Sequence, residues 1–204
     1  MSFYSRYILP HWIDLAMKNR EITRLRAAWI PRAKGNVLEI GIGSGLNLPF
    51  YSERVTHVLG VDPSIELQLM AKRRATRQVD VEFLSQSAEQ QLPIPDESID
   101  TVVMTWTLCS IPNPGDALRE VRRVLKTQGQ LLFIEHGRSR HSGVVAWQDR
   151  LTPAWRLIAG GCHLNRKIDG LIAAAGFQIK EMNTFYTVGP RPMTYTYQGL
   201  ANLA

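Results

Sequence analysis

Short apolar runs alternate with helical patterns along the chain from residue 36 onward. Apolar strands that alternate with helices are typical of a parallel sheet whose two faces are both covered. The runs with the length and composition of strands are residues 36–40, 56–61, 79–84, 99–104 and 130–135. The helices expected between them are residues 45–51, 64–77 and 114–126. The pattern therefore predicts a Rossmann-like, doubly wound α/β fold.

Two later features extend the predicted sheet. Residues 142–175 are rich in helical patterns, and residues 177–184 and 193–198 are expected to form two terminal strands. We expect a mostly parallel sheet with an antiparallel C-terminal strand, in a domain that spans residues 35–204. A helical insertion is expected on its substrate side, at about residues 140–175. A chain of 204 residues with 45% apolar and 21% charged residues suits one such domain.

Residues 1–34 form a basic amphipathic segment ahead of this domain. They carry seven Lys or Arg residues against two acidic ones, and so hold most of the formal charge of +6. The apolar positions at helical spacing are Ile13, Ala16, Met17, Ile22, Leu25 and Trp29. We expect one or two helices, for which three roles compete: a lid packed over an active site, a membrane-surface anchor, or a nucleic-acid contact.

Other features of the composition narrow the class of protein. The sequence has no apolar run of about 18 residues and no secretory leader pattern, so we expect a cytoplasmic protein. Its basic helix would make at most a weak peripheral contact with an anionic membrane, and nucleic acid is not an expected partner. Cys109 and Cys162 form no disulfide framework and no CxxC pattern, and we expect no metal site.

A glycine-rich turn follows the first predicted strand. Gly41, Gly43 and Gly45 let the backbone turn tightly and approach a ligand closely. Position 46 is Leu, so the spacing departs from the GxGxxG pattern of dinucleotide sites. Glu39 precedes the turn and would repel a pyrophosphate. A ligand with a cationic amino-acid end matches better, although the turn alone could also be purely structural.

A second acidic residue ends the next predicted strand. Asp62 follows the turn by about 20 residues, where a carboxylate accepts the hydroxyls of a ribose. The same residue could instead cap the helix that follows, because Asp is common at helix N-termini. Both interpretations stay open at this point.

Taken together, these motifs resemble the class I S-adenosylmethionine-dependent methyltransferases, in the branch of the ubiquinone and menaquinone enzymes. The resemblance rests on the acidic GxGxG strand end, Asp62, the SAE-x-x-LP loop and the segment LREVRRVLKTQGQL. It implies S-adenosylmethionine as the cofactor, with no metal. The cofactor-binding residues that it implies are Glu39, Gly41, Gly43, Gly45, Asn47, Asp62, Ser87, Ala88, Glu89 and Thr105.

The acceptor is expected beyond the carboxyl ends of the fourth and fifth strands, because ligands bind there in open α/β sheets. Methyl transfer from a sulfonium is an in-line displacement, so orientation carries most of the catalysis. The candidate acceptor-binding residues are Trp106, Cys109, Ser110, Trp147, Trp155, Cys162 and His163. The two tryptophans of the helical stretch could equally be core residues, and His163 could have a purely structural hydrogen bond.

The segments LCSI, the EH pair and LTPAWRLIAGGCHLNR resemble the small thiol S-methyltransferases. That family implies a thiol acceptor, which reacts as the thiolate. We therefore predict that Arg166 lowers the thiol pKa, that His136 or His163 removes the proton, and that Glu135 orients His136 or caps a loop. His136 could also be a structural strand-end residue.

The function predicted from the sequence is methyl transfer to a small acceptor, with a thiol or sulfide favoured. A phospholipid or quinone acceptor is an alternative, because methyltransferases of those substrates have a similar cofactor half. A noncatalytic cofactor-binding or nucleic-acid-binding protein is the alternative from another class.

Overall fold

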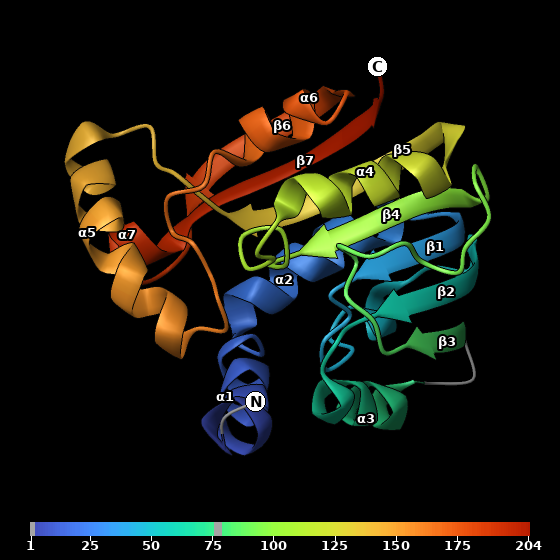
Figure 1. Ribbon diagram of the computed structural model, residues 1–204, viewed down its shortest axis with the longest axis horizontal. Helices are drawn as coiled ribbons and strands as arrows, with labels where there is room; N and C mark the ends of the chain where they lie inside the picture. The colour runs from blue at the N-terminus through green and yellow to red at the C-terminus, as the bar shows by residue number, and fades with distance from the viewer. Residues whose placement is uncertain (1–2, 76–78) are drawn as a thin grey trace.

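A computed structural model describes residues 3–75 and 79–204 of the chain (Figure 1). Within these residues a seven-stranded sheet has the order β3-β2-β1-β4-β5-β7-β6. Its strands are β1 (Gly35–Ile40), β2 (Val55–Val61), β3 (Asp80–Leu84), β4 (Ile99–Thr105), β5 (Leu125–His136), β6 (Phe177–Tyr186) and β7 (Tyr195–Leu203). The first five pair in parallel, whereas β7 runs antiparallel to both β5 and β6. The predicted sheet is therefore confirmed.

Helices flank the sheet and extend beyond one end of it (Figure 1). Before the sheet come the π-helix η1 (Tyr4–Ile8), α1 (Leu9–Ala16), α2 (Arg20–Trp29) and the 3-10 helix η2 (Ile30–Arg32). Within and after it come the 3-10 helix η3 (Leu48–Phe50), α3 (Ile65–Arg74), α4 (Pro114–Val124), α5 (Ser142–Ile158), α6 (Ile168–Ala174) and α7 (Arg191–Thr194). The helical stretch expected at about residues 140–175 thus consists of α5 and α6.

The two faces of the sheet hold separate apolar clusters, because successive side chains of a strand point to opposite sides. In β4, Val102 and Met104 belong to one cluster and Val103 to the other. Side chains of α4 and α6 complete the first cluster, and side chains of α2 and η2 complete the second. This sandwich fixes the carboxyl ends of the strands, which carry the candidate site.

The helix expected at residues 45–51 is wrong. The chain forms turns there and then η3. Gly45 has a φ of +78°, outside the right-handed helical region, and Pro49 lacks the N–H that a longer helix would use. The Asn47 side chain is instead turned toward the end of the sheet.

Other boundaries also differ from the predicted ones. The helix expected to reach residue 126 ends at Val124, because Leu125 is extended and begins β5. The strand expected at 193–198 starts at Tyr195, after α7, and runs to Leu203 between two partner strands. The helix expected at 64–77 is α3, for which Ser64 is the N-cap; residues 76–77 lie outside the described residues.

The amphipathic segment forms α1 and α2, separated at Asn19, whose side chain accepts a hydrogen bond from the Ile22 N–H at 2.9 Å. This N-cap satisfies a backbone N–H in the first turn of α2, so a new helix begins directly after Asn19. None of the helices in residues 3–75 and 79–204 is both long and apolar enough to cross a membrane.

Candidate active site

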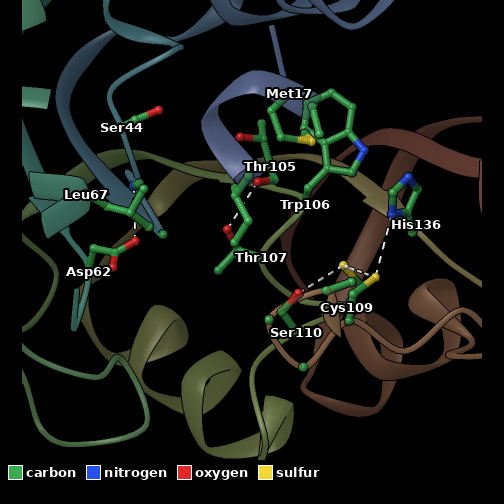
Figure 2. Close-up of a pocket in the computed structure, with 18 of the residues that line it drawn as sticks. Met17, Ser44, Asp62, Leu67, Thr105, Trp106, Thr107, Cys109, Ser110 and His136 are labelled. Carbon is green, nitrogen blue, oxygen red and sulfur yellow. Dashed lines mark hydrogen bonds between the residues drawn. The ribbon is translucent and has the colours of Figure 1, made fainter. Parts of the chain in front are cut away.

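The candidate active site is a cavity at the point where the strand order reverses. β2 and β3 lie on one side of β1, and β4 and β5 on the other. In open α/β sheets ligands bind beyond the carboxyl ends of the strands at this point. A cavity of about 870 Å³ lies there, covered by α1, α2 and the end of α5. Figure 2 shows Asp62 on one side of it, His136 and Cys109 on the other, and Trp106 between them.

The three glycines of the turn are needed for different structural reasons. All three have positive φ, between 53° and 78°. A Cβ added to Gly41 would lie 2.1 Å from Thr107 Oγ1, and one added to Gly45 would lie 2.9 Å from Ala71 of α3. At Gly43 the nearest atom would be 3.8 Å away, and this residue lines the cavity. Gly43 therefore leaves open space for a ligand, whereas Gly45 serves the packing of α3.

Asp62 lines the cavity at the end of β2. Its Oδ2 accepts a hydrogen bond from the Gly43 N–H at 3.0 Å, and its Oδ1 accepts one from the Ser64 N–H at 2.8 Å. Burial raises the pKa of this carboxyl, against those two hydrogen bonds. A carboxylate has about four acceptor positions, so two remain for a ligand. The interpretation of Asp62 as the helix cap is wrong, because Ser64 is the N-cap of α3, whereas the remaining acceptor positions of Asp62 are compatible with a bound ligand.

Glu39 is buried at the end of β1, where it is only 1% exposed. It accepts hydrogen bonds from Asn47 Nδ2 at 2.8 Å and from the Tyr51 hydroxyl at 2.7 Å. Asn47 also donates to Thr105 Oγ1 at 2.9 Å and accepts from Arg26 Nε at 3.0 Å. Burial outweighs these partners and raises the pKa of Glu39 to about 7.

The helix α1 is fastened to the glycine turn by Asp14, a residue that the sequence analysis did not single out. Asp14 Oδ1 accepts a hydrogen bond from Ser44 Oγ at 2.6 Å and lies 2.8 Å from Arg74 of α3. Burial acts to raise the pKa of Asp14, but hydrogen bonds from Arg74, Lys18 and Ser44 prevail and lower it to about 2. The available signal was that Asp14 is one of only two acidic residues in a basic amphipathic segment.

The loop that contains Ser87, Ala88 and Glu89 lines the cavity beyond Asp62. Ser87 Oγ donates to Glu89 Oε2 at 3.0 Å, and Glu89 Oε1 accepts from the Asn113 N–H at 2.7 Å. These hydrogen bonds fix the shape of the loop. The side chain of Ala88, which is 4% exposed, forms part of the cavity wall.

Glu135 lies behind the cavity wall and is fully buried. Its carboxylate accepts hydrogen bonds from the N–H groups of Thr107 and Leu108, both at 2.9 Å, and of Cys109 at 3.0 Å. All these bonds go to the loop that follows β4. Glu135 is therefore placed to position that loop, in line with the expected loop cap and away from a contact with the acceptor.

Arg166 also holds this loop from outside the cavity. Its guanidinium donates to the carbonyl groups of Leu108 at 2.7 Å and Ile111 at 2.6 Å. His163 Nδ1 lies 3.2 Å from the carbonyl oxygen of Cys109. The sequence assigned Arg166 to catalysis and His163 to the acceptor, but the structure places both behind the loop. Trp147, also expected in the pocket, is 56% exposed on α5, where Arg150 stacks over its ring.

The other acceptor candidates come together in the cavity. Trp106 has a φ of +52°, and Arg26 lies 4.8 Å from its ring centroid. The lining residues at this end are Trp106, Cys109, Ser110, His136, Trp155 and Cys162. They come from the loop after β4, the end of β5, and the segment from α5 onward. The structure thus brings these six predicted residues together although their segments are far apart in the sequence.

Comparisons with known proteins agree with this geometry. Residues 38–133 match the family described as Methyltransferase domain. The chain is 34% identical over 180 residues to thiol S-methyltransferase TMT1A of Homo sapiens, which covers 86% of this chain and 73% of that protein. It is 36% identical over 155 residues to TMT1B of Homo sapiens, covering 74% of this chain and 63% of that protein. It is also 36% identical over 115 residues to phosphatidylethanolamine N-methyltransferase of Cereibacter sphaeroides, covering 55% and 56%.

Solved structures share the fold at lower identity. A SAM-dependent methyltransferase from Aquifex aeolicus superposes with a TM-score of 0.65 and 20% identity, over 96% of this chain and 98% of that one. One from Leishmania major has a TM-score of 0.72 and 12% identity, over 98% and 80%. With 34% identity over 73% of human TMT1A, the chain belongs to the family of S-adenosylmethionine-dependent methyltransferases that includes the thiol S-methyltransferases.

Proposed function

We propose that this protein transfers the methyl group of S-adenosylmethionine to the sulfur atom of a small thiol or sulfide. The observation that carries the proposal is a single cavity with two chemically different ends. One end holds the glycine turn with Glu39 and Asp62, and the other holds Cys109, His136 and Cys162. The relatives named thiol S-methyltransferases support the same acceptor class.

The residues at the first end fit the cofactor. Pockets that hold small ligands have volumes of about 300–1,000 Å³, and this cavity has about 870 Å³. Asp62 would accept hydrogen bonds from the ribose hydroxyls, and Gly43 would let the backbone approach the cofactor closely. Ser87, Ala88 and Glu89 would lie along the edge of the adenine ring. The buried Glu39 network, with Asn47 and Thr105, would complement the positive amino-acid end. When bound, S-adenosylmethionine supplies an electrophilic methyl group on a sulfonium.

The second end supplies what a thiol acceptor needs. A thiol reacts as the thiolate, so nearby groups must favour loss of its proton. His136 lines this end, and the indoles of Trp106 and Trp155 give it apolar walls. Glu135 and Arg166 act as positioning residues, because they fix the loop that carries Cys109. The acceptor would be held by shape and oriented for in-line attack.

The helix α1 acts as a lid on this cavity. Ile13 and Met17 line the cavity, while Asp14 ties the helix to Ser44 and Arg74. Because α1 is bonded to the glycine turn, its closure over the acceptor would depend on the conformation of the cofactor-binding end. This is the first of the three roles considered for the N-terminal segment.

The same segment has an exposed apolar surface that favours a membrane contact. Its exposed side chains are Phe3, Tyr7, Ile8, Trp12 and Leu15, of which Trp12 also lines the cavity. Leu157 and Ile158 of α5 are also exposed, and the Tyr4 hydroxyl donates to the Ile158 carbonyl at 2.8 Å. We propose that this surface lies on an anionic bilayer, from which an apolar acceptor would enter the cavity. The same exposed surface favours a phospholipid as the second candidate acceptor, in agreement with the name of the Cereibacter sphaeroides relative, phosphatidylethanolamine N-methyltransferase.

The raised pKa of Glu39 predicts how cofactor affinity depends on pH. In the free protein Glu39 has a pKa of about 7, so it is mostly protonated at pH 6, whereas a cationic ligand favours the ionised form. Affinity should therefore rise roughly five- to tenfold between pH 6 and 7.5, because an α-amino group with a pKa of about 7.7–8.0 stays mostly charged over this range. Calorimetry at several pH values would measure this rise.

Two variants separate the causes of that pH dependence. Glu39→Gln keeps the shape of the side chain and should make affinity nearly constant over the same pH range. Asp62→Ala should weaken binding by about 1.5–3 kcal/mol, the range for hydrogen bonds to a charged group, and should keep the dependence on pH. Wild-type affinity that stays constant from pH 6 to 7.5 would contradict the proposed role of Glu39.

The acceptor proposal predicts a dependence on the pKa of the thiol. His136→Gln should slow transfer to alkyl thiols of high pKa far more than transfer to thiols that are already ionised, since only the former need help in losing a proton. Cofactor affinity should stay nearly unchanged. His163→Gln is the control, because that ring faces the Cys109 carbonyl outside the cavity. Equal slowing for all thiols would assign His136 to positioning, and unchanged rates would remove it from the reaction.

The membrane proposal predicts binding to vesicles. The double variant Trp12→Ser, Leu15→Ser should lose cosedimentation with acidic vesicles, and binding of the wild type should fall as salt shortens the Debye length from about 10 to 3 Å. Leu69→Ser removes an equally exposed apolar side chain on α3 and should bind like the wild type. Equal recovery of wild type and double variant would contradict a contact through α1.

A further inference from the structure

Three side chains at the acceptor end bring two sulfur atoms and an imidazole together. Cys109 Sγ lies 3.6 Å from Cys162 Sγ, which lies 3.7 Å from His136 Nδ1. The donor atoms of all three residues lie within 4.8 Å of one another (Figure 2). Both cysteines are free and buried. Their separation of 53 residues in the sequence conceals the cluster.

These distances match the edges of a tetrahedral zinc site. With zinc–sulfur bonds of about 2.3 Å and zinc–nitrogen bonds of about 2.0–2.1 Å, sulfur ligands lie about 3.8 Å apart and sulfur and nitrogen ligands about 3.6 Å apart. Two edges of the cluster already have these lengths. The third, between Cys109 and His136, would have to shorten by at most about 1.2 Å. Two thiolates with an imidazole are ligands that zinc prefers.

Each of the three proposed ligand residues is held in place by its own backbone contacts. His136 ends β5 and pairs with Thr196 of β7. The backbone of Cys109 is held by Glu135, and the Cys162 N–H donates to the Ala159 carbonyl at 3.2 Å. Ligands that are held independently keep their geometry with or without a metal ion.

The cluster is open on one side. Cys109, His136 and Cys162 all line the cavity, so a fourth position would point into the acceptor end. Three protein ligands with one open position are typical of catalytic zinc sites, whereas structural sites have four. A zinc ion with two thiolates and a neutral imidazole also has no net charge, which lowers the cost of placing it in this largely buried wall.

We propose that Cys109, His136 and Cys162 bind a zinc ion whose fourth position takes the sulfur of the methyl acceptor. The zinc site stands on its own geometry, and only the role of its fourth position rests on the proposed thiol acceptor. The acceptor thiol displaces a bound water, forms a zinc–sulfur bond and releases its proton to solvent, so His136 promotes thiolate formation as a zinc ligand and not as a free base. Its sulfur then bonds to the methyl carbon, while the carbon–sulfur bond of the cofactor breaks and its electron pair stays on the cofactor sulfur. The product is a neutral thioether, a weak ligand that leaves.

Cobalt(II) is the probe that tests the site without any turnover. The wild-type protein, reduced with a phosphine and freed of metal with a chelator, should bind a single equivalent of cobalt. The spectrum should show sulfur-to-cobalt charge transfer and the strong visible bands of a tetrahedral complex. Zinc should displace the cobalt. Addition of an alkyl thiol should strengthen the charge-transfer band, because a further thiolate joins the metal.

Variants assign the ligands. Cys109→Ser, Cys162→Ser and His136→Gln should each lower zinc affinity more than about 100-fold, since loss of even an outer-shell partner costs about 10- to 100-fold. His57→Gln is the control, because His57 lies on β2 beside Asp80. The wild-type titration needs no substitution, so it decides the outcome even where a variant fails to fold.

Each result has a distinct meaning. A weak octahedral cobalt spectrum, or a Cys109–Cys162 disulfide that forms in place of metal binding, would overturn the zinc site. If the metal-free enzyme methylates thiols at the full rate, the proposed role of zinc in the transfer fails and the proposed function stands. If cobalt binds as expected but no thiol alters its spectrum or accepts a methyl group, the site stands and the thiol acceptor fails.

Discussion

A single buried carboxylate, Glu39, constrains the cofactor end of the cavity. A charge removed from water must be paired or neutralised, and Glu39 meets that demand with Asn47 and Tyr51. Asn47 in turn contacts Thr105 at the end of β4 and Arg26 of α2. The glycine turn, two central strands and the N-terminal helices are thereby joined through one group. The raised pKa of Glu39 means that this group is only partly ionised until a cation approaches.

A second buried carboxylate organises the acceptor end in a similar way. Glu135 fixes the loop after β4 through three N–H groups, and Arg166 binds the carbonyl groups of the same loop. The two charged side chains therefore shape the wall that carries Cys109 without entering the cavity. Methyl transfer depends mainly on the orientation of the reactants. A loop whose N–H groups and carbonyl groups are both bound would hold the acceptor in a fixed orientation. This arrangement explains why the two cysteines and His136 meet although they belong to different elements.

The sequence predicted the sheet and the region of the site well, because both depend on local patterns. Apolar runs identified the strands, and the glycine turn with Asp62 located the cavity. Residues 45–51 were misjudged, since the positive φ of Gly45 and the tertiary contacts of Asn47 override a helical pattern. Asp14 was not predicted, and Cys109, Cys162 and His136 were predicted as site residues but not as one cluster, for a related reason: the partners lie far apart in the sequence and meet only in the folded chain.

The central claim is that one cavity brings a methyl donor and a small sulfur nucleophile together. The most direct measurement is a product-resolved assay with S-adenosylmethionine labelled in its methyl group, offered together with small thiols, phosphatidylethanolamine vesicles and a quinol. The account predicts that the label appears in the thioether of the thiol, with one molecule of S-adenosylhomocysteine released for each product. Label that appears only in the lipid headgroup or the quinol, with none in any thiol, would contradict it.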